Sequence, residues 1–149
     1  MKQAKTTKFI PTVDADRKWY IVDAKDQTLG RLATKVARII RGKEKVIFSP
    51  NSDTGDFVVV INAGQIKVTG KRETLKAYFH YSGYPGGLKE QSFLELKKKK
   101  PEYLIESAVK GMLPKNRLGN QLIKKLKVYS GEDHPHKAQK PELISLTEK

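Results

Sequence analysis

Three aspartates are the residues of this chain whose type and spacing could support catalysis. Asp23 ends one predicted strand, whereas Asp53 and Asp56 precede a second one. Paired carboxylates can hold Mg²⁺ for nuclease chemistry. If the two strands are parallel, however, Asp23 and Asp56 lie at opposite ends of the sheet, about 15–20 Å apart at the usual rise per strand residue. We therefore predict no catalytic carboxylate pair.

The sequence gives equally little support for a metal or cofactor site. His134 and His136 flank a proline, but a metal site would need a third ligand beside them. The chain has no cysteine, which excludes disulfides and thiolate metal sites. Neither predicted strand is followed by the glycine spacing of a dinucleotide site or a P-loop. We expect no enzyme activity, no cofactor, no metal and no small-molecule substrate.

Charge is the strongest global feature of the sequence. Thirty Lys and Arg residues against sixteen Asp and Glu residues give a net charge of +14. A domain this basic is usually matched to a polyanion, most often nucleic acid. The alternative is a basic surface that only water contacts. A membrane-surface protein is disfavoured, because no helix pairs a basic face with an exposed Trp- or Phe-rich face.

An aromatic segment beside a glycine-rich loop indicates RNA more specifically. Residues 78–81 contain three aromatic side chains around a histidine, and residues 82–87 can form only a loop, since two glycines follow a proline there. Basic residues at 71–72 precede this segment. Unpaired RNA bases stack on aromatic rings, and phosphates approach backbone amides. For Tyr78 and Phe79, burial in the core is an equally good interpretation.

The elements that must position these residues centre on residues 19–62, which read as strand, helix and strand. The helix spans residues 29–41, with Thr28 available as N-cap and Gly42 beyond its end. Its apolar residues fall in one arc and its basic residues in the other. Residues 57–61 are a continuous β-branched and aromatic run, the pattern of a strand covered on both faces. Together these segments predict a right-handed βαβ unit in a parallel sheet.

Outside residues 19–62 the hydrophobic pattern predicts the secondary-structure elements less sharply. We expect a short extended piece at 46–48, a short strand at 65–69, helices at 92–100 and 101–113, and a last helix at 118–127.

At 149 residues the chain fits one domain. We divide it into a basic N-terminal arm (1–16), a single α/β domain (17–131) and an extended C-terminal tail (132–149). No apolar run approaches the roughly 20 residues that span a bilayer, and residues 1–8 lack a secretory signal, so we expect a cytosolic or organellar protein.

Several segments in a fixed order form a recognisable pattern: 109–119 (VKGMLPKNRLG), 125–129, 134–139, 19–23, 29–33, 53–56, 60–63, 67–71 and 84–87. Together these segments resemble the bacterial-type large-subunit ribosomal protein L13 family. The resemblance covers roughly residues 17–142. Three positions depart from the family pattern: Tyr81 and Asn51 stand where the family often has His, and Asn120 where it commonly has Arg.

The resemblance implies a three-layer α/β/α sandwich around a four-stranded parallel sheet, with basic extensions and loops. It further implies a structural constituent of the large ribosomal subunit that binds large-subunit ribosomal RNA, contacts neighbouring subunit proteins and supports early subunit assembly. A free RNA-binding regulator or assembly factor acting off the ribosome is the rival interpretation. The predicted RNA-binding residues are Arg31, Lys35, Arg38, Arg41, Lys43, Lys45, Lys71, Arg72, His80, Tyr81, Tyr84, Gly86, Gly87, Lys110, Lys115, Asn116, Arg117, Lys124, Lys125, Lys127, His134 and His136.

Overall fold

The computed structural model describes residue 11 and residues 15–144. Most of the predicted N-terminal arm and the last five residues of the predicted tail lie outside the described residues. Within the described part, no helix is long and apolar enough to cross a membrane.

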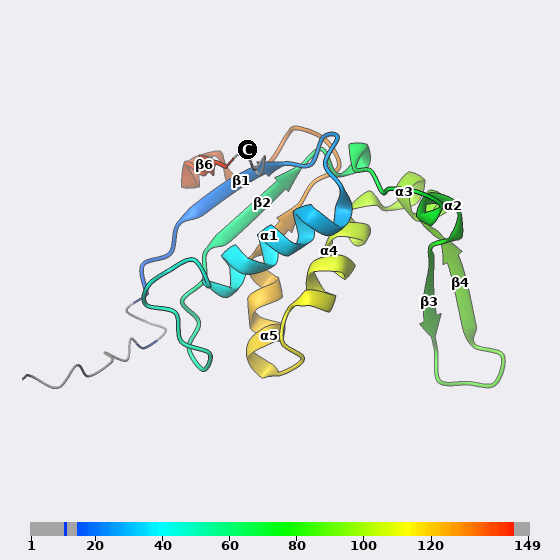
Figure 1. The fold of residues 1–149 in the computed structure, drawn as a ribbon, viewed down its shortest axis with the longest axis horizontal. Coiled ribbons are helices and arrows are strands. Elements are labelled where there is room, and N and C mark those ends of the chain that lie inside the picture. Colours follow the sequence, from blue (N-terminus) through cyan, green and yellow to red (C-terminus); the bar gives the residue numbers. More distant parts are fainter. Residues whose placement is uncertain (1–10, 12–14, 145–149) are drawn as a thin grey trace, which may run out of the picture.

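A central sheet of parallel strands organises the molecule (Figure 1). Its order is β5-β2-β1-β6, with β1 at Trp19–Asp23, β2 at Phe57–Ile61, β5 at Leu126–Val128 and β6 at Glu142–Leu143. The register pairs Trp19 with Phe57 and Asp23 with Ile61. Asp56 precedes β2 directly and therefore lies at the opposite end of the sheet from Asp23, as the sequence predicted.

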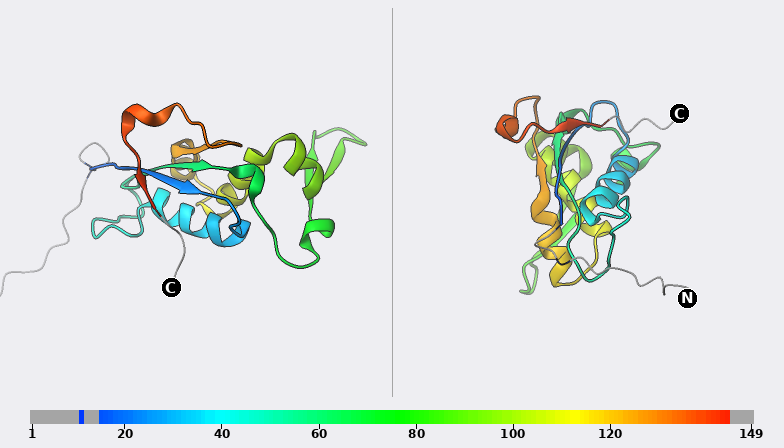
Figure 2. Two further views of the ribbon diagram at one scale, coloured as in Figure 1. Left: turned by 90° about the horizontal axis from the view of Figure 1, so that it is seen from above. Right: turned by 90° about the vertical axis from the view of Figure 1, so that its left-hand side faces the viewer.

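Helix α1 (Leu29–Arg41) has the predicted bounds, and its apolar arc is buried. Gly42 ends it with a φ of 80°, which favours glycine. The other helical elements are η2 (Ala63–Gln65), α2 (Arg72–Leu75), α3 (Phe93–Lys99), α4 (Pro101–Met112), α5 (Arg117–Leu122), η3 (Ile123–Lys125) and η4 (His136–Gln139). Figure 2 shows α1 on one side of the strands and α5 with η3 on the other, which confirms the predicted three layers.

The hydrophobic core lies between α1, the sheet and α4. The middle of β2, residues 58–60, is inaccessible to solvent, as expected for a strand covered on both faces. Helix α4 contacts α1, α3 and β5, so it ties the helices to the sheet. A separate antiparallel hairpin, β3 (Ala77–Tyr81) with β4 (Leu88–Ser92), projects away from this body (Figure 1).

Three sequence predictions about elements are wrong. Gln65 ends η2, and residues 66–69 contribute only an isolated bridge between Thr28 and Lys67 rather than a strand. Residues 46 and 47 lie in a turn, and residue 48 is not in a strand either. The last helix ends at residue 125, and residues 126–128 become β5 because they pair with residues 58–60 of β2. A long-range pairing therefore overrides the local helical pattern, as tertiary context often does.

The predicted C-terminal tail also contributes to the sheet. Its strand β6 pairs with Tyr20 and Ile21 at the edge of the sheet. Before it, the His136 ring lies 5.1 Å from the Trp19 ring, and Nε2 of His136 lies 2.9 Å from the hydroxyl oxygen of Tyr129. Trp19 itself stacks on Phe57 at 4.4 Å. His136 is therefore part of an aromatic cluster that holds the tail against the strands.

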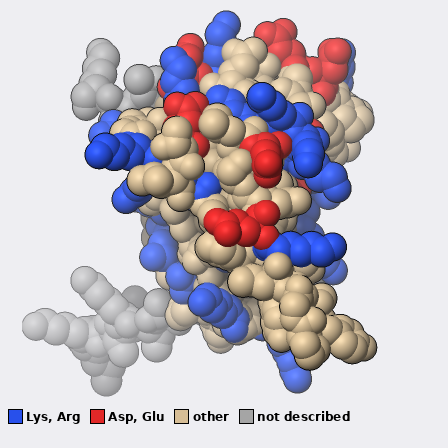
Figure 3. Space-filling view, turned by 90° about the vertical axis from the view of Figure 1, so that its right-hand side faces the viewer, with Lys and Arg blue, Asp and Glu red and all other residues tan. Residues whose placement is uncertain are grey.

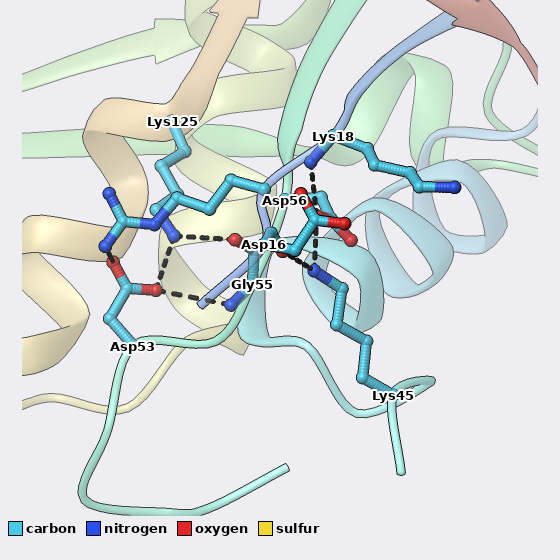
Figure 4. Close-up of polar contacts among 8 residues, drawn as sticks. Asp16, Lys18, Lys45, Asp53, Gly55, Asp56 and Lys125 are labelled. Carbon is cyan, nitrogen blue, oxygen red and sulfur yellow. Dashed lines mark hydrogen bonds and ion pairs between the residues drawn. The ribbon is translucent and has the colours of Figure 1, made fainter. Parts of the chain in front are cut away.

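A buried ion pair links the loop before β2 to the start of β5 (Figure 4). Lys125 is only 4% exposed. Its Nζ donates to the Asp53 carboxylate and, at 2.8 Å, to the backbone oxygen of Gly55. Burial lowers the pKa of Lys125, and the neighbouring Asp53 carboxylate opposes this shift. Lys125 is among the predicted RNA contacts, but protein oxygens enclose its ammonium group, so we leave it out of the candidate interface.

A second lysine holds the other end of the same loop. Nζ of Lys45 lies 2.6 Å from Oδ1 of Asp56 and 2.6 Å from the backbone oxygen of Asp16, while Asp56 also accepts a hydrogen bond from the backbone N–H of Lys18 at 2.8 Å. Between the two pairs, a Cβ built on Gly55 would lie 1.7 Å from the backbone oxygen of Ile40. The Asp-Thr-Gly-Asp segment is thus clamped between the end of α1 and the sheet.

The buried pair gives a prediction about stability. Lys125→Met removes the nearer cation from the buried Asp53 carboxylate and leaves only Arg17, 3.8 Å away and partly exposed, as its cationic partner, so it should lower the free energy of unfolding by about 3 kcal/mol. The double variant Asp53→Asn with Lys125→Met should recover most of this loss, because neither charge then remains buried. Urea denaturation measures both. The matched control is the exposed neighbour, Lys124→Met, which should stay within about 0.5 kcal/mol of the parent. A double variant as unstable as Lys125→Met would contradict the ion-pair interpretation.

The aromatic cluster gives a prediction about pH. Burial, with smaller effects from the nearby His134 and Lys127, lowers the pKa of His136. The unfolded chain therefore binds the proton more readily, and the free energy of unfolding should fall as the pH drops below about 6.5, the ordinary histidine pKa. NMR titration of the His136 ring should give a pKa below that value. A value at or above it would show that the ring is not enclosed by the cluster.

Candidate nucleic-acid interface

The buried stripe of α1 directs its basic side chains away from the sheet. Arg31 and Arg38 are exposed, whereas Lys35 and Arg41 are half-buried. Arg38 lies 4.0 Å from Glu44 at the surface, where water and salt screen such a pair. This face of α1 therefore presents cations outward, as the periodicity predicted.

Two hollows join this face of α1 to its neighbours. The cations that line them are Arg31, Arg72 and Lys76 in the first and Arg38, Arg41 and Lys43 in the second. Met112, at the end of α4, lines both hollows, and its sulfur accepts a hydrogen bond from the Thr34 hydroxyl at 3.5 Å. We call these six cations the α1 basic stripe. All of them except Lys76 are among the residues predicted from the sequence, and the fold brings Lys76 in at the end of α2.

The turn between α4 and α5, taken here as residues 113–119 and including the first residues of α5, is held by a helix-cap hydrogen bond and by a close approach of two backbone segments. Oδ1 of Asn116 accepts a hydrogen bond from the backbone N–H of Gly119 at 2.8 Å and so caps α5. A Cβ on Gly119 would lie 1.8 Å from the backbone oxygen of Pro114, so only glycine fits there. Lys115 and Arg117 are exposed on this turn. The turn therefore displays two cations on a fixed backbone, while Asn116 has a structural role.

Other predicted contacts are more scattered. Lys71, in the turn before α2, is exposed and lines a shallow hollow with Arg72 and Lys76. Lys110 and Lys124 are exposed, Lys127 and the two histidines 134 and 136 are half-buried, and none of these five residues lines the two hollows beside α1. Lys45 is engaged by Asp16 and Asp56, which leaves it less available to RNA than predicted. Within the described part of the chain, no three carboxylate or imidazole side chains gather as a metal site would require.

The hairpin separates the aromatic residues into two environments. Tyr78 is half-buried, 6.2 Å from the Tyr103 ring, and burial raises its pKa. Phe79, in contrast, is 63% exposed. The core interpretation therefore holds for Tyr78 and fails for Phe79, because alternate residues of a strand point to opposite faces.

The loop at the tip of the hairpin is ordered by its own backbone. The N–H of Gly87 donates to the carbonyl oxygen of Tyr84 at 2.9 Å, and Gly86 has a φ of 74°. A Cβ on Gly87 would lie 2.1 Å from the Ser82 hydroxyl oxygen. His80, Tyr81 and Tyr84 are exposed nearby. Figure 3 shows the visible face of the projecting end without charged side chains, whereas both basic and acidic side chains lie beside it. The predicted glycines thus shape the loop, and the predicted rings lie on its surface.

Comparison with known proteins identifies the family. The sequence model of the family described as ribosomal protein L13 matches residues 17–135. The large ribosomal subunit protein uL13 of Syntrophomonas wolfei is 61% identical over 133 residues, which cover 89% of this chain and 92% of that protein. The uL13 proteins of Cyanothece sp. (58%, covering 91% of each chain) and Maridesulfovibrio salexigens (56%, covering 89% and 94%) are similarly close. This chain belongs to the ribosomal protein L13 family.

Proposed function

We propose that this protein is a structural constituent of the large ribosomal subunit that binds large-subunit ribosomal RNA and supports early subunit assembly. Its relatives are named as proteins of that subunit, and its net charge of +14 suits a polyanionic partner. It acts by binding and not by catalysis, as a member of a family of structural proteins. The relatives' names favour this role over that of a free regulator acting off the ribosome.

The observation that carries the proposal is the turn at residues 113–119. Its two exposed cations, Lys115 and Arg117, stand on a backbone that the close approach of Gly119 to Pro114 fixes. A preorganised turn loses little conformational entropy when it binds, so its charges contribute more of their interaction energy to affinity. Lys115 supplies a point charge for a phosphate, and Arg117 a planar fork that can grip two phosphate oxygens.

The α1 basic stripe extends the proposed interface beyond the turn. Met112 lines both hollows of the stripe and ends α4, and Leu113 follows it at the start of the turn. The stripe and the turn are therefore joined through the end of α4. A surface of this kind binds phosphates without reading their sequence, so the RNA fold must supply the specificity.

The turn yields a prediction about affinity and salt. Lys115→Ala with Arg117→Ala should weaken binding to large-subunit ribosomal RNA by about 1–3 kcal/mol, the range for hydrogen bonds to charged groups. The slope of log K against log salt should become shallower by about 0.7–0.9 for each lost phosphate contact. Filter binding over a series of salt concentrations measures both quantities.

Thermal melting and a matched control complete this test. The melting temperature should not fall, because both side chains are exposed. Lys25→Ala with Lys137→Ala removes the same charge from exposed positions outside the turn and the stripe, and it should leave the salt slope closer to that of the parent. Equal effects of the two variants would mean that net charge, and not the turn, drives binding. A lower melting temperature for the first variant would make the turn a packing element.

A further inference from the structure

One face of the hairpin carries large apolar side chains that nothing in the described chain covers. Phe79 and Tyr81 point to the same side of β3, and Leu88 of β4 pairs directly with Tyr81. These three residues are 63%, 60% and 61% exposed. Tyr84 in the adjoining loop is 75% exposed. Exposed apolar groups at this density usually mark a binding surface.

The opposite face of the hairpin has a different character. It carries Tyr78, which contacts the Tyr103 ring, together with the cross-strand pair His80 and Lys89. Tyr78, His80 and Lys89 line a hollow with Lys100 of the α3–α4 junction, and Phe79 also borders this hollow. Strand alternation directs His80 and Lys89 to one face of the hairpin and Phe79 and Tyr81 to the other.

The spacing of the free rings suits nucleic acid bases. Residues two apart on a strand are separated by about 6.6–6.8 Å, which is close to twice the roughly 3.4 Å that separates stacked bases. Rings displayed on a sheet surface are a known way to hold unpaired RNA bases, because every base offers a π-face. Lys71 and Arg72, at the start of α2, and Lys89, on the other face of the hairpin, are exposed and available to the phosphates of the same RNA strand.

Glu90 favours RNA over a protein as the occupant of this face. It pairs with Phe79 across the hairpin and therefore lies among the free rings. A sealed protein interface would bury this carboxylate, which is costly without a cationic partner. Against splayed-out bases it stays hydrated and can accept hydrogen bonds from the exocyclic amino groups of adenine or cytosine.

We propose that the Phe79–Tyr81 face of the hairpin binds unpaired RNA bases by stacking, with Leu88 and Tyr84 extending the platform. This inference rests on the proposed RNA-binding function and adds a contact of a different kind. The α1 basic stripe and the turn at residues 113–119 bind phosphates, whereas this face binds bases that are free of Watson–Crick partners.

The test compares two single-stranded probes with the full-length protein. One is an oligoadenylate of about ten nucleotides, within the usual site size of single-strand-binding modules. The other is an abasic oligomer of the same length, which keeps the phosphates and removes the bases. The parent protein should bind oligoadenylate at least about tenfold more tightly than the abasic oligomer, the usual contribution of one stacked base.

Paired variants then assign the effect to the rings. Phe79→Leu with Tyr81→Leu keeps the surface apolar and should abolish the preference for oligoadenylate without changing the salt slope. The control, Phe79→Tyr with Tyr81→Phe, keeps both rings and should retain the preference. Because both positions are exposed, neither variant should lower the melting temperature by more than a surface substitution does.

The outcomes separate this inference from the proposed function. Equal affinity for the two probes, or a preference that survives in the leucine variant, overturns base stacking while leaving phosphate binding intact. Loss of binding to a large-subunit protein in the leucine variant, with unchanged preference for oligoadenylate, would reassign this face to a protein partner. No binding to either probe or to large-subunit ribosomal RNA would overturn the proposed function itself.

Discussion

The ion pair between Lys125 and Asp53 is the interaction on which the arrangement of the sheet depends. It joins the loop before β2 to the residue that precedes β5. It therefore fixes where two neighbouring strands of the sheet begin. Gly55 makes this possible, because any side chain there would collide with the backbone of α1. A buried ammonium group is stable only with its partners in place. The same loop therefore also fixes the C-terminal end of α1, where Arg38 and Arg41 of the α1 basic stripe lie.

This arrangement divides the lysines and arginines into two groups with different roles. Lys125 and Lys45 are held by carboxylates and backbone oxygens inside the protein and stabilise the fold. The exposed cations of α1, α2 and the turn at residues 113–119 remain hydrated at the surface, and we propose that their field attracts RNA. A rigid interior lets this surface be displayed without a large entropic cost on binding. The hairpin adds aromatic rings that we propose contact the bases, whereas phosphate contacts alone do not read the base sequence.

The βαβ unit and the outward basic face of α1 could be predicted from the sequence, because periodicity and burial act locally there. The role of Lys125 could not, since its two neighbours at 124 and 127 are also lysines and only the fold tells which one is enclosed. Strand β5 was missed for a similar reason: residues 126–128 continue a helical pattern but pair with a strand more than 60 positions away. Alternation along residues 78–81 was the available signal that Phe79 differs from Tyr78, and it becomes decisive only once β3 is known to be a strand.

The division of the lysines into buried and RNA-facing sets can be measured most directly by lysine acetylation followed by mass spectrometry, on the free protein and on its complex with large-subunit ribosomal RNA. Lys125 should react slowly in both states, because its ammonium group is enclosed by Asp53 and Gly55. Lys115 and Lys43, both exposed, should react quickly in the free protein and become protected in the complex. Fast labelling of Lys125 in the free protein, or no protection of Lys115 and Lys43 by RNA, would contradict the account.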